Sequence, residues 1–424
     1  MRETIFTYAA PALKFGSGAA AELGHDLLGY DARRVLLVTD PGVAATGHPA
    51  RIAEEISRHG IAVTTYAEAR CEPTDESLTA AIGFARSEGP FDAIVAVGGG
   101  SSIDTAKAVN LLTTNPGELM DYVNSPVGKA HAPVNALLPL VAVPTTTGTG
   151  SESTTICVLD VLSLHVKTGI SHPALRPTLA VVDPSLTESQ PKMVTASAGM
   201  DILCHAVESW TARPYDDFDA KQPDERVPYC GANPIADLWS ERALSLLAGA
   251  FRSAVGDASD REVRERMAMA ATFAGLGFGN AGVHIPHANA YPVAGRVRSY
   301  RPEGYPPDEP IVPHGMAVSM TAAEAFRFTF EAAPERHLAA ASLLDPAGEH
   351  HRPRDGAAAL PGVLVALMRD IGLPSGLAEI GYTSGDVDDL VEGSLKQQRL
   401  LATSPRPVEA DDLAAIIGDS LENW

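Results

Sequence analysis

The chain has 424 residues, with 32 Lys and Arg against 53 Asp and Glu, so its net charge is −21. This acidic balance argues against nucleic acid and against anionic membrane surfaces as main partners. Hydrophobic residues make up 45% of the chain, which is ordinary for a globular protein, and the length predicts two domains with separate cores.

The N-terminal sequence MRETIFTYAAPALKFG lacks a basic region followed by a long apolar run, so we expect neither a secretory signal nor a transit peptide. Apolar runs stay shorter than the roughly 18 residues that a membrane span requires. The 4 cysteines lie far apart and form no CxxC pair, which indicates free thiols in a reducing compartment. We therefore expect a cytoplasmic protein with no membrane partner.

The first half alternates short apolar runs with helical patterns, which is typical of a parallel α/β sheet. The expected strands cover residues 35–40, 61–66, 92–97, 140–144, 155–159 and 178–183. The expected helices cover residues 49–59 and 75–88, with a third running from the glycines at 98–100 through about residue 112. Residues 1–185 are therefore predicted to form a dinucleotide-binding α/β domain.

After about residue 184 the strand-like runs nearly vanish, and long segments rich in Ala, Leu, Arg and Glu predict a helical domain over residues 186–424. The expected helices of this domain cover residues 192–212, 234–256, 258–280, 315–331, 335–345 and 355–371. Two Pro-rich breaks, residues 213–234 and 301–313, are too long for simple connections and indicate functional loops or covers.

The segment GGGSSID, residues 98–104, lies between an expected strand and an expected helix. Glycines let the backbone approach a phosphate, and a helix N-terminus offers free N–H groups and the positive end of the helix dipole. Because Ile103 takes the third glycine position of the GxGxxG pattern, a glycine-rich turn capped by Ser101 or Ser102 is the alternative. Asp40 closes the first strand, where a carboxylate binds a ribose hydroxyl or caps the next helix.

The run PTTTGTGSE, residues 144–152, follows another expected strand. Its hydroxyl groups suit a phosphate, a ribose or an amide, and ligands of α/β sheets bind beyond the carboxyl ends of the strands. A polar turn held by hydroxyl–backbone hydrogen bonds is the alternative.

Asp201 and His205 lie four residues apart on one expected helix and therefore share a face. His284 and His287 follow in a later segment, and His314 opens a further helix, whose N-terminus favours the neutral imidazole that binds metals. A lone histidine is usually structural, but an Asp/His pair with clustered histidines downstream predicts a metal site.

Together these motifs resemble the iron-dependent (group III) alcohol dehydrogenases over essentially the whole chain, through GGGSSIDTAK, PTTTGTGSE, GMDILCHAVE, the His287 segment and PHG. Three segments are closer still to the hydroxyacid-oxoacid transhydrogenase branch: CGANP at 230–234, FAGLGFGNAGVH at 273–284 and SPRP at 404–407. The resemblance implies the dehydroquinate-synthase-like fold of this family. That fold has an α/β N-terminal nucleotide-binding domain with a parallel sheet, an all-α C-terminal domain and a cleft between them.

The resemblance also implies a divalent metal, Fe²⁺ with Zn²⁺ as the alternative, whose ligands would be Asp201, His205, His287 and His314. It leaves His284 as a structural or outer residue. Tyr291 stands where many relatives carry histidine, as expected for the transhydrogenase branch, and is the candidate for passing the proton. The implied NAD(H) contacts are Asp40, Gly99, Gly100, Ser101, Asp104, Thr145, Thr146, Thr149 and Lys167.

The reaction that the resemblance implies is hydride transfer between a nicotinamide ring and the carbinol carbon of a small molecule. The expected substrates are 4-hydroxybutyrate and 2-oxoglutarate, and a homodimer is expected on the same basis. A hydroxy acid needs a basic anchor for its carboxylate. The candidate anchors, of which we expect at most two to serve, are Arg226, Arg298, Arg301, Arg399 and Arg406.

Other functions stay open at this point. An NAD-linked alcohol dehydrogenase or aldehyde reductase acting on another small anionic aldehyde, such as a phosphonate-bearing one, would use the same anchor. A dehydroquinate-synthase-like lyase would share the architecture, but the one-Asp, three-His set and the PTTTGTGSE pattern argue against it. A non-catalytic binding protein is disfavoured because every expected metal position is filled.

Overall fold

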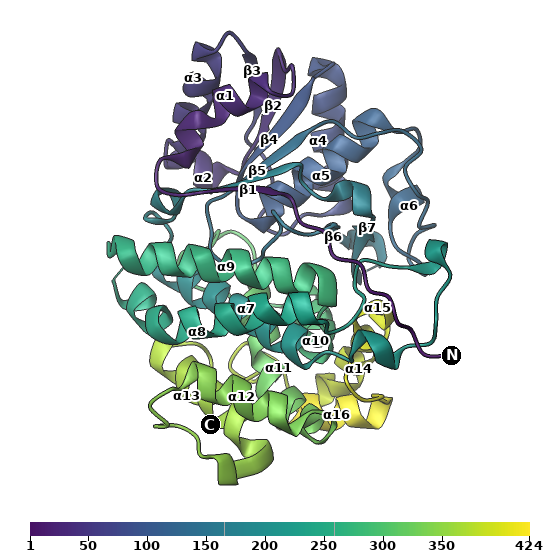
Figure 1. The fold of residues 1–424 in the computed structure, drawn as a ribbon, viewed down its shortest axis with the longest axis vertical. Helices are drawn as coiled ribbons and strands as arrows, with labels where there is room; N and C mark the ends of the chain where they lie inside the picture. The colour runs from purple at the N-terminus through teal and green to yellow at the C-terminus, as the bar shows by residue number, and fades with distance from the viewer. Residues whose placement is uncertain (165, 258) are drawn as a thin grey trace. The chain divides into compact units, whose positions relative to one another are not determined.

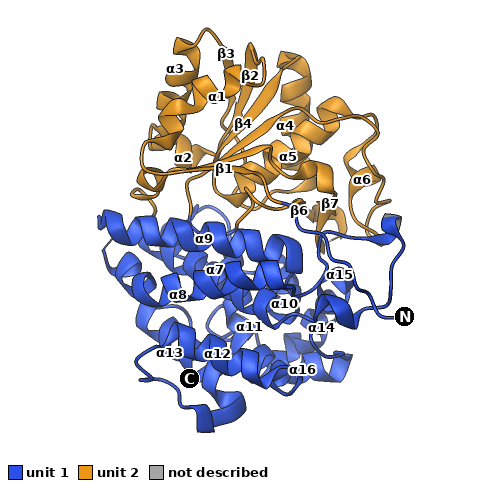
Figure 2. Ribbon diagram, viewed as in Figure 1, with its two compact units in different colours: residues 1–9, 147–149, 191–424 blue, residues 10–146, 150–190 orange. Residues whose placement is uncertain are grey.

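The computed structural model describes residues 1–164, 166–257 and 259–424. The chain divides into two compact units, coloured separately in Figure 2. Unit 1 comprises residues 1–9, 147–149 and 191–424, and unit 2 comprises residues 10–146 and 150–190. The predicted boundary after residue 185, which would separate two independently folding domains, stays a prediction.

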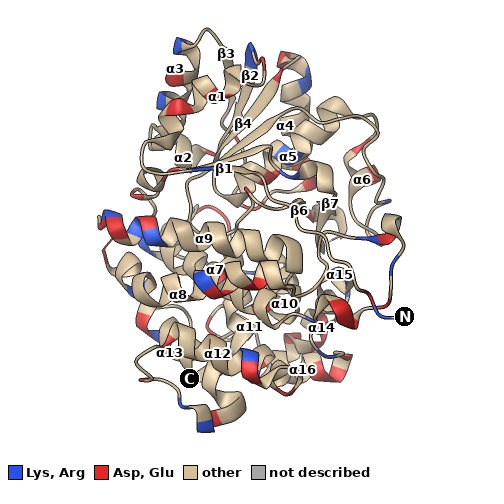
Figure 3. Cartoon of the chain, in the orientation of Figure 1, with Lys and Arg blue, Asp and Glu red and all other residues tan. Residues whose placement is uncertain are grey.

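Unit 2 is built on a parallel sheet of 6 strands in the order β1-β8-β5-β4-β2-β3 (Figure 1). Its strands are β1 (Ala12–Phe15), β2 (Arg34–Val38), β3 (Ala62–Tyr66), β4 (Ala93–Gly98), β5 (Leu140–Pro144) and β8 (Leu179–Val182). Apart from Arg34 at its start, β2 carries no charged residue, and neither do β4 and β5 (Figure 3). Such continuous apolar strands fit a sheet covered on both faces.

Helices pack on both faces of this sheet. Alternate residues of β2 enter separate cores: Leu36 and Val38 belong to one, and Val35 and Leu37 to the other. The helices of unit 2 are α1 (Leu23–Leu28), α2 (Pro41–Ala45), α3 (His48–Arg58), α4 (Asp75–Glu88), α5 (Gly100–Thr114) and α6 (Leu119–Tyr122). The α/β class and the three helices expected in this half are confirmed.

The strand expected at residues 155–159 is β6 (Ile156–Val161), but it lies outside the parallel sheet. It pairs antiparallel with β7 (Val166–Ser171), a strand that the sequence analysis missed. Neither β7 nor the edge strand β1 has the continuous apolar run that indicates a central parallel strand, because each contains a lysine. This explains why the pattern did not predict them.

Unit 1 is helical around one large core. Its helices are α7 (Lys192–Thr211), α8 (Pro234–Gly256), α9 (Arg261–Ala281), α10 (Ile285–Gly295), α11 (His314–Thr329), α12 (Pro334–Leu344), α13 (Ala359–Ile371), α14 (Val387–Leu395), α15 (Gln398–Leu401) and α16 (Ala410–Asp419). The prediction for residues 258–280 corresponds to α9, and residue 258 itself lies outside the described residues. Across the described residues, no helix is long and apolar enough to cross a membrane.

Four helices of unit 1 were not predicted, namely α10, α14, α15 and α16, and a fifth, α13, differs from its prediction. The short α10 contains Pro286 and Pro292, which obscure a helical pattern. The helix expected at 355–371 is a 3-10 turn followed by α13, because Gly356 has non-helical backbone angles. Helix α14 is short and acidic and was not predicted.

Candidate metal and cofactor sites

Helix α7 presents three polar residues, Asp201, His205 and Glu208, at spacings of four and three, so they lie on one face. All three side chains are buried. The helix packs closely on α11 because residue 315 is glycine. A Cβ atom there would lie 2.1 Å from the carbonyl oxygen of Ser197 and 2.7 Å from the Cβ of Asp201.

Two further helices bring histidines to this face. His287 belongs to the first turn of α10, and His314 is the first residue of α11. The Oδ1 atom of Asp201 lies 3.6 Å from His287 Nε2 and 4.0 Å from His314 Nε2. It also lies 3.7 Å from His205 Nδ1. The four residues predicted as metal ligands are therefore brought together.

The unsatisfied atoms of this cluster fit a cation. Among the described residues, Asp201 Oδ1, His205 Nδ1 and His287 Nε2 are buried and have no hydrogen-bond partner. Buried polar atoms rarely stay unpaired, and such atoms call for an ion or another ligand. One carboxylate with imidazoles is a donor set that suits Fe²⁺ or Zn²⁺.

The candidate ligand atoms of the four residues are not equally close to one another. The candidate ligand atoms of Asp201, His287 and His314 all lie within 4.8 Å of one another, a limit that His205 does not meet. The ring of His205 stacks on Phe278 with their centroids 3.7 Å apart and also on the ring of His287 at 4.5 Å. His205 is thus held beside the tight group of three.

The charges of these side chains depend on burial and on one another. Burial alone would raise the pKa of Asp201, but the neighbouring His205 and His314 hold it well below its usual range. Burial lowers the pKa of His205 to about 3, which leaves this ring neutral. Burial also opposes the charge of His287, but Glu208 and Asp201 outweigh it and raise the pKa of His287 to about 9.

Sequence reasoning missed Glu208, although it ends the GMDILCHAVE motif. Its Oε2 atom accepts a hydrogen bond from His287 Nδ1 at 2.5 Å. Its Oε1 atom accepts from the backbone N–H of His284 at 2.8 Å. The ring of His284 contacts the Thr211 hydroxyl at 3.1 Å, which fits the outer role expected for His284. The spacing of three from His205 was the available signal.

Tyr291 lies on α10 one turn beyond His287 and is 6% exposed. Its ring centroid lies 6.4 Å from that of His314, in an edge-on arrangement. The structure therefore places the candidate proton carrier beside the histidine cluster, within unit 1.

In unit 2 the parallel register aligns the ends of β2, β4 and β5. Asp40 follows β2 and plays the capping role that the sequence left open: its Oδ1 accepts from the backbone N–H of Val43 at 2.9 Å. Its Oδ2 accepts from the Ser102 hydroxyl at 2.9 Å. The carboxylate thus joins the turn after β2 to the first turn of α5.

The N-terminus of α5 fits a phosphate group. Its N-cap residue is Gly99, which has no side chain to bind the first N–H groups of the helix. Gly100 is the first helical residue. A Cβ on Gly99 would meet Thr146 at 3.4 Å, so the two loops approach closely. The Ser101 hydroxyl donates to the carbonyl of Cys71.

Asp104 has a structural role. Its Oδ1 accepts from Ser151 Oγ at 2.6 Å, and its Oδ2 accepts from the backbone N–H of Val158 at 2.9 Å. Lys107, which sequence reasoning missed, is fully buried and donates to Ser151 Oγ at 2.7 Å and to the carbonyl of Ile156 at 2.7 Å. These contacts fix the PTTTGTGSE loop against α5. The implied NAD(H) contact of Asp104 stays a prediction.

The hydroxyl-rich run divides between the units. Thr145 and Thr146 belong to unit 2, and Thr149 belongs to unit 1. Thr145 Oγ1 is buried without a hydrogen-bond partner among the described residues, as expected of an atom that binds a ligand. Lys167 is not the solvated lysine that the sequence left as an alternative: it is buried and pairs with Glu72 and Asp160.

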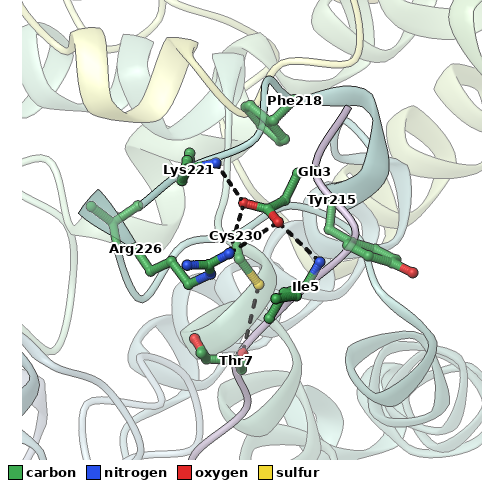
Figure 4. Close-up of a pocket in the computed structure, with 9 residues that line it drawn as sticks. Glu3, Ile5, Thr7, Tyr215, Phe218, Lys221, Arg226 and Cys230 are labelled. Atoms are coloured by element: carbon green, nitrogen blue, oxygen red, sulfur yellow. Dashed lines mark hydrogen bonds and ion pairs between the residues drawn. The ribbon is translucent and has the colours of Figure 1, made fainter. Parts of the chain in front are cut away.

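The candidate anchors for a substrate carboxylate have other contacts. Arg226 binds both oxygens of Glu3, at 3.2 and 3.3 Å, in a small pocket that Cys230 also lines (Figure 4). Arg298 pairs with Asp386, and Arg301 donates to the carbonyl of Pro307. The remaining two lie over aromatic rings: Arg399 over Tyr229 and Arg406 over Phe328. Their proposed role as anchors gains no support from these contacts.

Family models match most of the chain. The model described as "Iron-containing alcohol dehydrogenase" matches residues 10–184, and "Fe-containing alcohol dehydrogenase family, C-terminal" matches residues 227–421. A relative from Xenopus laevis, the mitochondrial hydroxyacid-oxoacid transhydrogenase, is 42% identical over 98% of this chain and 90% of its own length.

Two solved structures are also similar. A 1,3-propanediol oxidoreductase is 29% identical with a TM-score of 0.85, covering 98% of this chain and 100% of its own. Sulfoacetaldehyde reductase from Bifidobacterium kashiwanohense, solved in complex with NAD⁺, is 26% identical with a TM-score of 0.80 and covers 98% of each chain.

Proposed function

Since this chain belongs to the iron-containing alcohol dehydrogenase family, we propose that it is a hydroxyacid-oxoacid transhydrogenase that uses 4-hydroxybutyrate and 2-oxoglutarate. That it is an oxidoreductase follows from the family. The observation that carries the proposal is the buried cluster of Asp201, His205 and His287, with its three unpartnered atoms, in a chain so similar to transhydrogenases.

We assign a separate role to each group of residues. Asp201, His205, His287 and His314 would hold the ion, and the uncapped N-terminus of α5 would bind the cofactor pyrophosphate. When bound, the ion would supply Lewis-acid polarisation of a carbinol or carbonyl oxygen, and the nicotinamide would supply the hydride acceptor and donor. Iron is the ion named by the family models, and zinc is supported only by the donor set.

Tyr291 would handle the proton of the reaction at its phenol oxygen. Oxidation of the hydroxy acid releases one proton together with the hydride, and reduction of the oxo acid takes up one of each. The two half-reactions therefore balance without a net proton or free cofactor. The position of the Tyr291 ring beside His314 supports this role.

An NAD-linked reductase of a small anionic aldehyde is the second candidate. Sulfoacetaldehyde carries a sulfonate, and the reductase named for it is among the similar structures. The family match favours either oxidoreductase over a dehydroquinate-synthase-like lyase.

Cytoplasmic location and homodimeric assembly remain proposals. The transhydrogenase relatives are named as mitochondrial proteins, so subcellular fractionation of the source cells is needed to place this chain. Sedimentation of the purified protein would test the dimer.

Turnover without added nicotinamide separates the two candidate functions. Purified, iron-loaded protein receives 4-hydroxybutyrate and 2-oxoglutarate, and 2-hydroxyglutarate is measured. We expect sustained turnover, with an Asp201→Ala variant as the inactive control. Turnover that requires free NAD⁺ or NADH and accepts other aldehydes would support the reductase instead.

A further inference from the structure

We infer that Glu208 is a positioning residue of the metal site, which fixes both the tautomer and the orientation of the His287 ring. This inference rests on the proposed function, because it concerns the same ion. It assigns a role to a buried carboxylate that is not itself among the predicted ligands.

The contact between Glu208 and His287 determines where the ring proton lies. A carboxylate only accepts hydrogen bonds, so the Nδ1 atom of His287, 2.5 Å from Glu208 Oε2, must carry the proton. In the neutral ring, which is the form that binds a metal, the lone pair would then lie on Nε2. This is the atom that lies 3.6 Å from Asp201 Oδ1 and has no partner among the residues that the structure describes.

The other oxygen of Glu208 holds the backbone of the same residue. Oε1 accepts from the N–H of His284, the N-cap residue of α10, at 2.8 Å, and from the N–H of His287 at 3.3 Å. These are two of the N–H groups that a helix leaves unpaired at its N-terminus. Glu208 on α7 therefore fixes both the ring and the main chain of His287.

Glu208 has the burial that such a role requires. Its side chain is 0% exposed, and it lies one turn beyond His205 on α7, the helix that also carries Asp201. One rigid helix thus supplies two candidate ligands and the group that orients a third. Partners of this kind fix metal-bound histidines, and their loss weakens metal binding about 10- to 100-fold.

The chain contains a matched control outside this cluster. Asp345 accepts from His351 Nδ1 at 3.0 Å and from the backbone N–H groups of His350 at 2.7 Å and Glu349 at 3.2 Å. It therefore makes the same combination of one imidazole and two amide contacts. None of these four residues belongs to the metal cluster found among the described residues.

Glu208→Gln is the test variant because it keeps the size of the side chain. If the amide oxygen stays on the backbone N–H groups, the amide NH₂ faces Nδ1 and favours the tautomer protonated on Nε2. We expect Glu208→Gln to bind Co²⁺ about 10- to 100-fold more weakly than the wild type, with an altered d–d absorption spectrum. Asp345→Asn should keep both the affinity and the spectrum.

The outcomes separate this inference from the proposed function. If the wild type binds no Co²⁺, the metal site itself and the proposed function fail. If the wild type binds Co²⁺ and Glu208→Gln matches its affinity and spectrum, only the positioning role is overturned.

If Glu208→Gln does not fold, a measurement on the wild-type protein tests the inference instead. In ¹⁵N-histidine-labelled protein loaded with Zn²⁺, NMR should find the proton of His287 on Nδ1. A proton on Nε2 would overturn the inference.

Discussion

At the scale of single residues, the histidines of unit 1 fall into two groups with different surroundings. Three lie around Asp201, and the facing atoms of Asp201, His205 and His287 have no hydrogen-bond partner among the described residues. His337, in contrast, has both ring nitrogens paired, with the Thr329 hydroxyl at 2.9 Å and the Ala333 carbonyl at 2.8 Å. Satisfied hydrogen bonds mark His337 as structural, whereas the unpartnered atoms beside Asp201 make His205 and His287 candidate ligands.

His337 should make stability depend on pH. Burial lowers the pKa of His337 from its usual value near 6.5 to about 4, so protonation favours the unfolded chain. Its stabilising contribution is complete above pH ~6.5 and is lost as the pH falls toward 4. Each pH unit in this range costs about 1.4 kcal/mol, so about 2 kcal/mol is lost by pH 5.

Urea unfolding of the wild type and of His337→Gln at pH 7.5 and pH 5 measures this loss. The wild type should lose about 2 kcal/mol more than the variant between the two pH values, because glutamine does not titrate. Equal losses would mean that His337 titrates normally in the folded protein.

Tyr291→Phe tests the proton path. If the phenol passes the proton, kcat should fall by about 10²- to 10⁴-fold and the pH–rate profile should lose one limb. Tyr382→Phe is the matched control, since Tyr382 is also buried and donates its hydroxyl to the carbonyl of Val293 on α10. An unchanged rate and profile in Tyr291→Phe would remove Tyr291 from the mechanism.

At the scale of elements, the cluster depends on how closely α7 and α11 pack. Gly315→Ala would place a methyl group 2.1 Å from the Ser197 carbonyl oxygen, so α11 must move away from α7 and carry His314 with it. We expect a loss of about 1–3 kcal/mol in unfolding free energy and weaker metal binding. Urea unfolding and Co²⁺ titration measure the two effects.

Gly83→Ala is the control for this substitution. Gly83 lies inside α4 with open space where its Cβ would be, so alanine should stabilise the helix by about 0.5–1 kcal/mol without affecting the metal. If Gly315→Ala behaved like Gly83→Ala, the tight α7–α11 contact would have no role in forming the site.

The sequence predicted elements well where periodicity was strong and poorly where it was not. Helix α4 begins and ends at the predicted residues because Thr74 caps it and the apolar spacing is regular. Helix α10 carries a candidate ligand but has a proline in its first turn and another inside, and its buried face extends all round. No amphipathic pattern could reveal such a helix.

Motifs located the candidate ligands, but spacing could not identify their supporting partners. Asp201 and His205 share a helix face by simple periodicity. The hydrogen bonds that Glu208 accepts from residues 284 and 287 join positions 76 and 79 residues apart, and the bond that Lys107 donates to Ser151 spans 44 residues. Such long-range partners depend on how the helices pack, which one sequence does not reveal.

At the scale of the whole molecule, the candidate ligands come from α7, α10 and α11, and these helices all belong to unit 1. An ion that binds only the folded protein stabilises it by about 2.7 kcal/mol when its concentration is 100 times its Kd. Hydrogen exchange with and without Fe²⁺, under anaerobic conditions, should therefore respond locally. We expect the ion to slow exchange in these three helices, while β2, β4 and β5 of unit 2 keep their rates.

Adding a chelator should reverse that protection, and Asp201→Ala should show no response to Fe²⁺, because it lacks the oxygen that faces all three imidazoles. A uniform slowing in both units would indicate general stabilisation rather than an ion held by these helices. No slowing in α7, α10 and α11 would mean that the cluster does not bind Fe²⁺, whatever the enzyme does with its substrates. The local pattern thus tests the metal site separately from hydride transfer.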